Sequence, residues 1–210
     1  MSLRFEPPII CLITNGVGED FDFADARRDI LDIVRIAVDE NISLVQIREK
    51  RLSARRIFEL TAAAAAITRE STTRLLVNDR ADIALAAGAD GVHLTANSLP
   101  VAVIRKDFPE EFIIGVSTHT LEATKNAAQD GADFTVFAPV FETPGKGMAQ
   151  GLLALSEVCE RVRPFPVIGL GGIDESNCDS VIASGASGIA AIRSLNDAES
   201  LRAIAGKLRT

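Results

Sequence analysis

The chain has 210 residues, a net charge of −7 and an isoelectric point near 4.9, and 47% of its residues are hydrophobic. This length predicts one domain over residues 1–210, and the hydrophobicity excludes a disordered chain. No apolar run approaches the roughly 20 residues of a membrane helix. The acidic charge and the lack of a Lys- or Arg-rich run argue against nucleic-acid binding. We therefore expect a protein that binds neither membranes nor nucleic acid.

The cysteines and the first residues bear on the compartment. The three cysteines are an odd number without C-x-x-C spacing, which argues against a disulfide framework or a structural zinc site and favours reduced thiols in a core. The first 16 residues contain one Arg, then Pro-Pro and only a short apolar run, which fits a first strand better than a signal peptide. We therefore expect a cytoplasmic protein.

Short β-rich segments alternate with helical segments along the whole chain. Strands are predicted at residues 9–14, 44–47, 75–78, 91–94, 112–117, 134–137, 166–171 and 188–192. Helices are predicted at residues 25–41, 53–70, 80–88, 98–108, 121–131, 152–162, 175–185 and 196–209. Each predicted strand is therefore followed by a helix.

A weak internal repeat supports this alternation. Residues 86–94, 128–137 and 182–192 each place Gly-Ala-(Asp or Ser) between a helix and a strand, where the Gly suits a left-handed helix stop. Apolar strands joined by helices indicate a parallel sheet with both faces covered. Eight such units predict an α/β fold, a (β/α)8 TIM barrel, with an open doubly wound sheet as the alternative.

The sequence QIREK, residues 46–50, ends the second predicted strand with a cluster of charges. Because side chains alternate along a strand, Gln46, Arg48 and Lys50 share one face, and Ile47 and Glu49 point to the other. In a barrel this face meets the carboxyl-end opening, where enzymes of this fold bind their ligands. Two cations and an amide predict an anion site, with a solvated charge cluster as the alternative.

Two further loops are candidate phosphate sites. VFETPGKG offers the hydroxyl of Thr143, the charge of Lys146 and glycine amides, although an ordinary Pro-Gly turn also explains it. IGLGGID ends the seventh predicted strand in Gly171 and Gly172, at the usual phosphate position of barrels, with Arg193 after the eighth strand as an added charge. The alternative there is a tight turn that caps the next helix.

The remaining polar candidates end the third, fourth and fifth strands. Asn78 and Asp79 lie at the end of the third strand, and Ser117 and His119 lie at the end of the fifth. His119 is a candidate acid or base near pH 7, whereas His93 inside the fourth strand is expected to be a packed residue whose ring is hydrogen-bonded. No serine has the spacing of a nucleophile elbow, which argues against a hydrolytic triad.

The motifs QIREK, VNDR, DGVHL, GVSTHT, GADFTVFAPVFETPGKG and PVIGLGGI lie in this order across residues 44 to 193. Together they resemble the family of thiamine phosphate synthase and its close relative, thiazole tautomerase. In the synthases a TIM barrel joins a hydroxymethylpyrimidine diphosphate to a thiazole phosphate and releases pyrophosphate with the help of Mg²⁺. The resemblance therefore implies small phosphorylated substrates as partners and Mg²⁺ as cofactor, and a homo-oligomer is compatible with it.

The resemblance assigns roles to residues at the diphosphate end of the site. It implies that Gln46, Arg48 and Lys50 hold the diphosphate, with Asn78 beside them and Asp79 on the metal. Departure of pyrophosphate from an electron-rich pyrimidine leaves a carbocation-like centre. Cations that stabilise the leaving group are what such a step requires.

The resemblance also assigns the other end of the site. Ser117 matches a serine near the pyrimidine and the leaving group, Thr143 and Lys146 match a loop that grips pyrophosphate, and the amides of Gly171 and Gly172 match a cradle for the thiazole phosphate. With His119 as the residue of the alternative tautomerase, the implied catalytic residues are Arg48, Lys50, Ser117, His119 and Lys146.

The sequence departs from the synthases after the fourth strand. There a G-Q-x-D type run supplies a second acidic Mg²⁺ ligand, and this chain has Ser98 at the place of the acid. Loss of a charged ligand weakens a hard cation site. The tautomerases also lack this acid, and in them a histidine that matches His119 moves the proton without a metal. The retained diphosphate residues favour the synthase, with the tautomerase and a non-catalytic regulatory protein that binds thiazole phosphate as alternatives.

Overall fold

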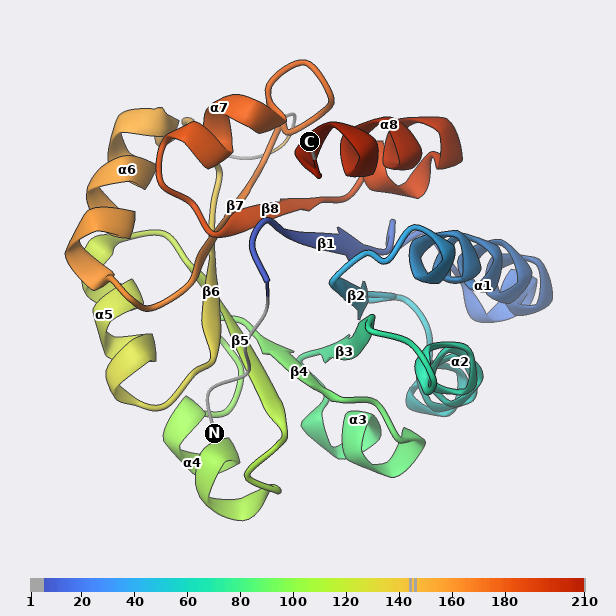
Figure 1. Cartoon of the computed structure of the whole chain (residues 1–210). Coiled ribbons are helices and arrows are strands. Elements are labelled where there is room, and N and C mark those ends of the chain that lie inside the picture. Colours follow the sequence, from blue (N-terminus) through green and yellow to red (C-terminus); the bar gives the residue numbers. More distant parts are fainter. Residues whose placement is uncertain (1–5, 144, 146, 210) are drawn as a thin grey trace.

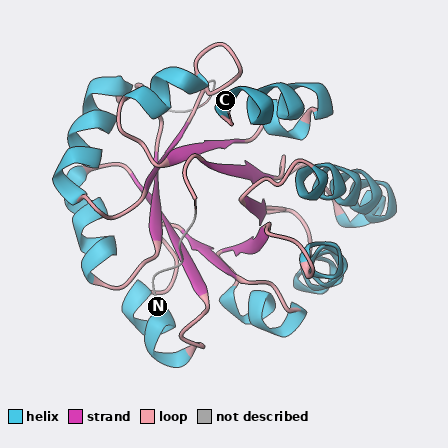
Figure 2. Cartoon of the chain, viewed as in Figure 1, coloured by secondary structure: helices cyan, strands magenta, loops and turns pink. Residues whose placement is uncertain are grey.

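The computed structural model describes residues 6–143, 145 and 147–209. Across these residues, parallel strands pair in chain order from β1 to β8, and β8 pairs with β1 to close a barrel. Figure 1 shows the helices as a ring outside the strands, with α8 next to α1, and Figure 2 shows the strands gathered at the centre. The chain is thus a (β/α)8 TIM barrel, and the open doubly wound sheet is excluded.

The elements follow the predicted alternation. The strands are β1 (Ile9–Ile13), β2 (Leu44–Ile47), β3 (Arg74–Asn78), β4 (Gly91–Leu94), β5 (Ile113–Thr118), β6 (Phe134–Phe137), β7 (Val167–Leu170) and β8 (Gly188–Ala191). The helices are α1 (Phe23–Asp39), α2 (Ala54–Thr68), α3 (Ala81–Ala87), α4 (Val101–Asp107), α5 (Leu121–Gln129), α6 (Gly151–Val162), α7 (Cys178–Ala183) and α8 (Ala198–Leu208). Short 3₁₀ turns, Asp20–Asp22 and Ser194–Asn196, precede α1 and α8.

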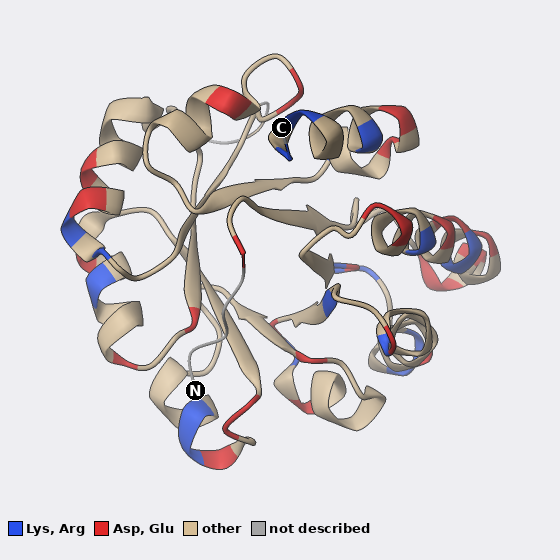
Figure 3. Cartoon of the chain, viewed as in Figure 1, with Lys and Arg blue, Asp and Glu red and all other residues tan. Residues whose placement is uncertain are grey.

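Both faces of the strands are buried, which explains their continuous apolar sequences. One set of side chains fills the barrel, with Phe134 of β6 as its largest member, and a second set packs against the helices. Arg74 is the single Lys, Arg, Asp or Glu residue within the strands, and Figure 3 shows the charges on helices and connecting segments instead. Cys11 lies in the interior, where burial raises the pKa of its thiol to about 12, as expected for a reduced core cysteine.

Two helices, α4 and α7, begin three residues later than predicted. Pro100 precedes the first residue of α4, and its fixed backbone angle ends the extended segment that the prediction had placed in the helix. Before α7, Asp174 accepts hydrogen bonds from the N–H and the hydroxyl of Ser176, so residues 174–177 form a turn rather than a first helical turn. In the described part of the chain, no helix combines the length and apolar character needed to cross a membrane.

The structure shows four copies of the helix-to-strand repeat, one more than the three that the sequence predicts. Gly88, Gly131 and Gly185 end α3, α5 and α7 in the left-handed conformation, and Asn41 takes the same position after α1 with φ of 48°. After Asn41, Gly88 and Gly131, the next residue closes the helix with a backbone hydrogen bond to the carbonyl five residues back, as when the Ala89 N–H donates to the Ala84 carbonyl. Asn tolerates the left-handed conformation, so the first copy lacks the glycine that marks the others.

The third position of this repeat secures the amino ends of the strands. Asp90 accepts a bond of 2.7 Å from the N–H of Leu75 in the neighbouring strand, and Asp133 accepts one of 2.7 Å from Ile114. Ser43 holds Ile10 in the same way, at 3.2 Å. Each of these residues immediately precedes an even-numbered strand and binds the odd-numbered strand before it. In these three copies, the last residue of the repeat therefore bonds two neighbouring strands together at the amino end of the barrel.

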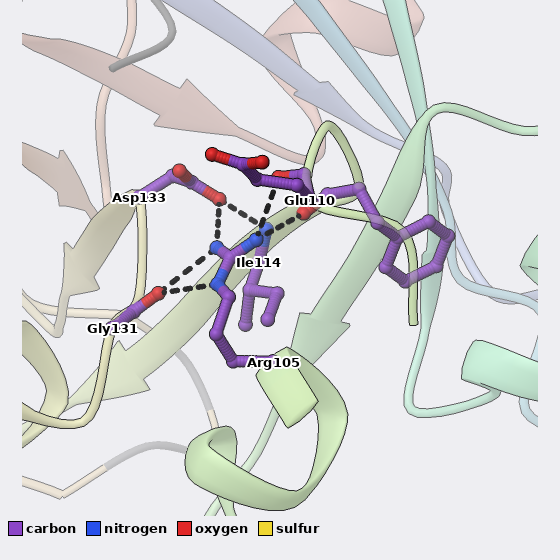
Figure 4. Close-up of polar contacts among 6 residues, drawn as sticks. Arg105, Glu110, Ile114, Gly131 and Asp133 are labelled. Atoms are coloured by element: carbon purple, nitrogen blue, oxygen red, sulfur yellow. Dashed lines mark hydrogen bonds and ion pairs between the residues drawn. The ribbon is translucent and has the colours of Figure 1, made fainter. Parts of the chain in front are cut away.

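Arg105, in the last turn of α4, adds further contacts to the repeat at Asp133 (Figure 4). Its guanidinium forms an ion pair of 2.7 Å with Asp133 and donates to the carbonyl oxygens of Gly131, Phe112 and Glu110. Both charged side chains are largely buried, with exposed fractions of 25% for Arg105 and 17% for Asp133. A charge shielded from water needs this degree of hydrogen bonding, so α4, β5 and β6 are tied together at one point.

Candidate active site

A cavity of about 350 Å³ opens at the carboxyl ends of the strands. Every strand, or the first residues after it, contributes a side chain to its lining. The described lining residues are Ile13, Gln46, Arg48, Lys50, Asn78, His93, Thr95, Ala96, Asn97, Ser117, His119, Ala138, Pro139, Thr143, Leu170, Gly171 and Ile192. This is the position at which barrels of this kind bind their ligands.

The cavity has two chemically different walls. From β2 to β5 the lining is mostly polar and includes Arg48, His93 and Ser117, whereas from β6 round to β1 it is mostly apolar and includes Leu170 and Ile192. Among the described lining residues there are two cations and no carboxylate. A protein of net charge −7 therefore presents a positive, partly apolar cavity, which suits a ligand with an anionic group and a flat or apolar body.

The segment after β2 has the alternation that the sequence predicts. Gln46, Arg48 and Lys50 line the cavity. Glu49 points away from it, and its buried carboxylate accepts the backbone N–H groups of Gly16 at 3.1 Å and Gly18 at 3.0 Å. Glu49 thus fixes the loop after β1 against the loop after β2.

Arg48 is half-buried and supported from the neighbouring strand. Its backbone N–H donates to the buried Thr14 hydroxyl at 2.8 Å. A Cβ atom added at Gly16 would lie 3.0 Å from the Arg48 carbonyl oxygen and 3.1 Å from one guanidinium nitrogen, so glycine makes room for this side chain. No ion pair is formed by Arg48 with the described residues, which leaves its guanidinium available to an anion.

Asp79 lies beside the cavity and not in its lining. It has a positive φ of 64°, and its N–H donates to the His93 carbonyl at 2.9 Å. The Ser98 hydroxyl donates a short hydrogen bond to the Asp79 carboxylate and accepts one of 2.7 Å from the Thr95 N–H. The residue at the place of the second acid is therefore a hydrogen-bond partner of the first one.

His93 and Ser117 form a pair at the cavity wall, which the sequence did not predict. The His93 Nε2 atom lies 2.8 Å from the Ser117 hydroxyl oxygen, whereas Nδ1 is buried without a hydrogen-bond partner among the described residues. The expectation of a packed histidine with a hydrogen-bonded ring nitrogen is thus confirmed, and Nδ1 is the nitrogen left without a partner among the described residues. Burial, and to a lesser extent the charge of Arg48, lowers the pKa of His93 to about 4, so the ring is neutral near pH 7.

His119 joins the loops after β5 and β6. Its Nδ1 atom lies 2.6 Å from the Ala138 carbonyl oxygen, which only accepts, so Nδ1 carries the proton. The neutral ring then has its acceptor at Nε2. The side chain of Gln150 donates to the His119 carbonyl at 2.6 Å, and its backbone N–H donates to the Pro139 carbonyl at 2.8 Å. Gln150 therefore connects the end of the long loop after β6 to the start of that loop and to the loop after β5.

Close packing of two loops explains the pair of glycines after β7. A Cβ atom at Gly171, whose φ is 112°, would lie 2.9 Å from the Pro139 backbone, and one at Gly172 would lie 2.8 Å from Glu142 and Phe141. The Phe141 N–H also donates to the Gly171 carbonyl at 3.0 Å. Gly171 lines the cavity, so both loops shape its edge.

Most of the predicted site residues converge on the cavity. Gln46, Arg48, Lys50, Asn78, Ser117, His119, Thr143 and Gly171 line it. Gly172 lies one residue beyond the lining, and Lys146 lies outside the described residues. Arg193 is exposed at the start of a 3₁₀ turn and does not line the cavity. The apolar wall was missed, since its residues have the same composition as the core.

Comparison with known proteins identifies the relatives of this barrel. The sequence matches the thiamine monophosphate synthase family over residues 17–195. The chain belongs to this family. The thiamine-phosphate synthase of Methanoculleus marisnigri is 40% identical to it over 181 residues, 85% of each chain. The putative thiamine-phosphate synthase of Geobacter sulfurreducens is 43% identical over 171 residues, 80% of each chain.

A solved structure extends the likeness to three dimensions. The thiamine phosphate pyrophosphorylase of Pyrococcus furiosus superposes with a TM-score of 0.81 at 31% identity, covering 96% of this chain and 93% of that one. The match therefore extends over nearly all of both chains and agrees with the family assignment.

Proposed function

We propose that this protein is a thiamine-phosphate synthase, a transferase of thiamine biosynthesis. It would join hydroxymethylpyrimidine diphosphate to thiazole phosphate and release pyrophosphate, as the sequence resemblance implies. The observation that carries the proposal is the cavity with two cations, an apolar wall and no described carboxylate in its lining. Its relatives with synthase names support the same reading. The three cysteines are buried and free, which agrees with a cytoplasmic enzyme.

The two walls suit the two parts of such substrates. The diphosphate would lie against Arg48, Lys50 and Gln46, where a planar guanidinium holds phosphate oxygens with two donors. The heterocyclic rings would pack on the apolar wall near Leu170 and Ile192. Holding both substrates in one cavity places the attacking nitrogen next to the carbon that loses pyrophosphate. The cations stabilise the negative charge on the departing group.

Mg²⁺ is part of this proposal, with Asp79 as the one carboxylate that would hold it. Within the described part of the chain, no three His, Cys, Asp or Glu side chains gather as a metal site, so the protein alone does not form a cage. Mg²⁺ is often bound by one or two carboxylates together with substrate phosphates, and Asp79 with a diphosphate fits that pattern. The metal would add positive charge at the leaving group. Ser98 supplies no charge, so we expect weaker binding than with two acids.

The test is release of pyrophosphate from both phosphorylated substrates by the purified chain, with Mg²⁺ and with EDTA. Release that requires the metal supports the proposal, and release that persists in EDTA overturns the role of Mg²⁺. No release, from protein that still binds thiazole phosphate, overturns the synthase in favour of a tautomerase or a binding protein. His119→Gln is the matched variant, because it removes the tautomerase base and is expected to keep synthase turnover within about threefold.

Two substitutions test the metal ligand. Asp79→Asn should lower Mg²⁺-dependent turnover by about 100-fold, because it removes the single acid. Ser98→Asp restores the second acid of the synthase pattern, and Asp also accepts the Thr95 N–H that Ser98 accepts now. It should lower the Mg²⁺ concentration for half-maximal rate by about tenfold. An unchanged metal requirement in both variants would place the metal elsewhere.

A further inference from the structure

The surroundings of the His93 ring decide which residue donates in the hydrogen bond between His93 and Ser117. A neutral imidazole carries its proton on one nitrogen only. If Nδ1 carried it, a buried N–H donor would have no acceptor, since the described residues offer Nδ1 no partner. If Nε2 carries it, the Ser117 hydroxyl oxygen accepts it at 2.8 Å and Nδ1 is a bare lone pair. Buried donors without partners are rarer and more costly than buried acceptors without partners, which favours the proton on Nε2.

The packing holds the ring in this position. The ring of Phe134 lies 6.1 Å from the His93 ring, centroid to centroid, and is tilted by 43°. A Cβ atom on Gly115 would lie 2.4 Å from Phe134 and 2.9 Å from the His93 Nδ1 atom, so the Nδ1 edge of the ring abuts this glycine. His93 is 2% exposed. The ring is therefore fixed by its neighbours, and Nδ1 has no space for a partner on that side.

The strand register brings the two side chains together. His93 of β4 pairs with Gly115 of β5, and Ser117 follows two residues later on the same face of that strand. Both residues line the cavity. Arg48 is the charged group that acts on His93, and its positive charge opposes protonation of the ring. The pair is thus neutral, built into the wall and open to the ligand on the Ser117 side.

We propose that His93 donates its Nε2–H to the Ser117 hydroxyl oxygen and thereby leaves the Ser117 O–H to donate into the cavity. His93 is then a positioning residue, and Ser117 selects a ligand atom that accepts a hydrogen bond, such as a ring nitrogen or a phosphate oxygen. This inference rests on the proposed synthase function for the identity of the ligand. The direction of the hydrogen bond is a property of the free protein.

The first test is nitrogen NMR of the full chain with ¹⁵N-labelled histidine. The sequence has two histidines, so the His119→Gln variant assigns both sets of signals. We expect His93 to show a protonated Nε2 and an unprotonated Nδ1 at about pH 7.5. A protonated Nδ1 would overturn the proposal.

The second test is a double-mutant cycle of kcat/KM for pyrophosphate release. His93→Phe keeps a ring and removes the donor, and it should lower kcat/KM by about tenfold in the wild-type chain and by less than about twofold in the Ser117→Ala chain. Equal losses in both chains would make His93 merely structural and overturn the proposal. In His93→Gln the side-chain amide can donate in place of the ring, so kcat/KM should be at least about threefold higher than in His93→Phe.

The two proposals fail in different ways. A wild-type chain without turnover would contradict the synthase function, while the nitrogen spectra would still report which ring nitrogen carries the proton. If His93→Phe does not fold, the spectra of the wild-type chain and the His93→Gln variant keep the inference testable. A wrong protonation pattern in an active enzyme would contradict the role of His93 alone.

Discussion

The two ends of the barrel use charged side chains in opposite ways. At the amino end, the Arg105 guanidinium is fully engaged by Asp133 and by three carbonyl oxygens. At the carboxyl end, Arg48 has only its backbone fixed, by Thr14, and its guanidinium forms no ion pair with the described residues. The first arrangement stabilises the fold, and the second reserves a charge for a ligand. Stability and binding are therefore separated along the barrel axis, as in other proteins of this fold.

The difference arises from how each end is encoded. At the amino end, a three-residue motif places the helix stop and the strand acceptor next to each other in sequence, as in Gly131, Ala132 and Asp133. At the carboxyl end, each strand contributes one or two residues to the cavity, and no local motif contains the site. Contacts at the amino end thus come from a local sequence repeat, whereas the cavity at the carboxyl end is formed by residues that are far apart in the sequence. Substitutions at the two ends should accordingly affect different measurements.

The largest expected effect is that of Arg48→Ala on activity. Loss of a bidentate phosphate donor should lower kcat/KM for pyrophosphate release by about 100- to 1000-fold. Arg48→Lys should recover part of this, because a point charge reproduces the attraction without the two-pronged contact. Thermal unfolding should change little in either variant, since Arg48 is not paired within the described protein. The exposed Arg28→Ala is the control for both measurements.

The contrary outcomes for Arg48 are clear. Full activity in Arg48→Lys would mean that the guanidinium geometry is not used. A large fall in the unfolding temperature of Arg48→Ala would mean that this residue stabilises the fold, and the contrast between the two ends would disappear. Either result is read from steady-state kinetics and thermal unfolding on the same protein samples.

The next effect is the dependence of stability on pH through His93. Its folded pKa is about 4, below the ordinary value of 6.5, so between these values the unfolded chain binds a proton that the folded chain does not. Stability is therefore fully present above about pH 6.5 and falls as the pH decreases toward 4. The loss amounts to about 3 kcal/mol over this range. Denaturant unfolding at several pH values measures it.

His93→Gln is the control for this dependence. It removes the titrating group and keeps a polar side chain, so the difference between its stability and that of the wild type should shrink as the pH falls. A constant difference from pH 7 to pH 5 would show that His93 binds its proton equally well in the folded protein and in the unfolded chain, and would contradict the lowered pKa. Subtracting the two curves removes the contribution of the many carboxylates, which titrate in both chains.

The sequence predicts the amino end and the barrel better than the site. Alternating elements and the Gly-Ala-Asp repeat suffice for the strand order, although Asn41 conceals one copy, because nothing in its residue type distinguishes a left-handed stop from an ordinary loop. The polar wall is also predicted, since residues such as Gln46 and Arg48 are unusual at the end of a buried strand.

Other parts of the site depend on geometry that a sequence does not contain. Ile13, Leu170 and Ile192 form part of the apolar wall, but in the sequence they are indistinguishable from core residues. The His93–Ser117 pair requires the register of β4 on β5, which decides whether the two side chains share a face. Arg193 is predicted in the site from its position after β8, and in the structure it is exposed at a 3₁₀ turn outside the lining of the cavity.

A smaller effect is expected from Asp133→Ala at the amino end. It removes the ion-pair partner of the largely buried Arg105 and the acceptor of the Ile114 N–H, which should cost about 2–3 kcal/mol of unfolding free energy. Asp133→Asn keeps an acceptor oxygen for the N–H of Ile114 and should cost less. Well below the unfolding temperature, kcat/KM should be unchanged in both. A selective loss of activity at constant stability would contradict the separation of the two ends.

Gly171→Ala should affect both measurements, because Gly171 shapes the cavity and packs against the loop after β6. Its φ of 112° is unfavourable for Ala, and the added Cβ would lie 2.9 Å from the Pro139 backbone. We expect the free energy of unfolding to fall by about 1–3 kcal/mol and the KM for the phosphorylated substrates to increase. Unchanged stability and kinetics would show that the two loops separate easily.

The smallest effect is that of the matched change Gly206→Ala in α8. Gly206 is exposed inside a helix, and a Cβ atom there meets nothing within 4 Å, so the substitution adds no contact and creates no clash. Ala restricts the unfolded chain and favours the helix, which should stabilise the protein by about 0.5–1 kcal/mol without any change in kcat/KM. Denaturant unfolding resolves a change of this size. Because the same chemical change is made at both glycines, destabilisation by Gly206→Ala would mean that the loss at Gly171 reflects the added methyl group in general and not the contact between the two loops.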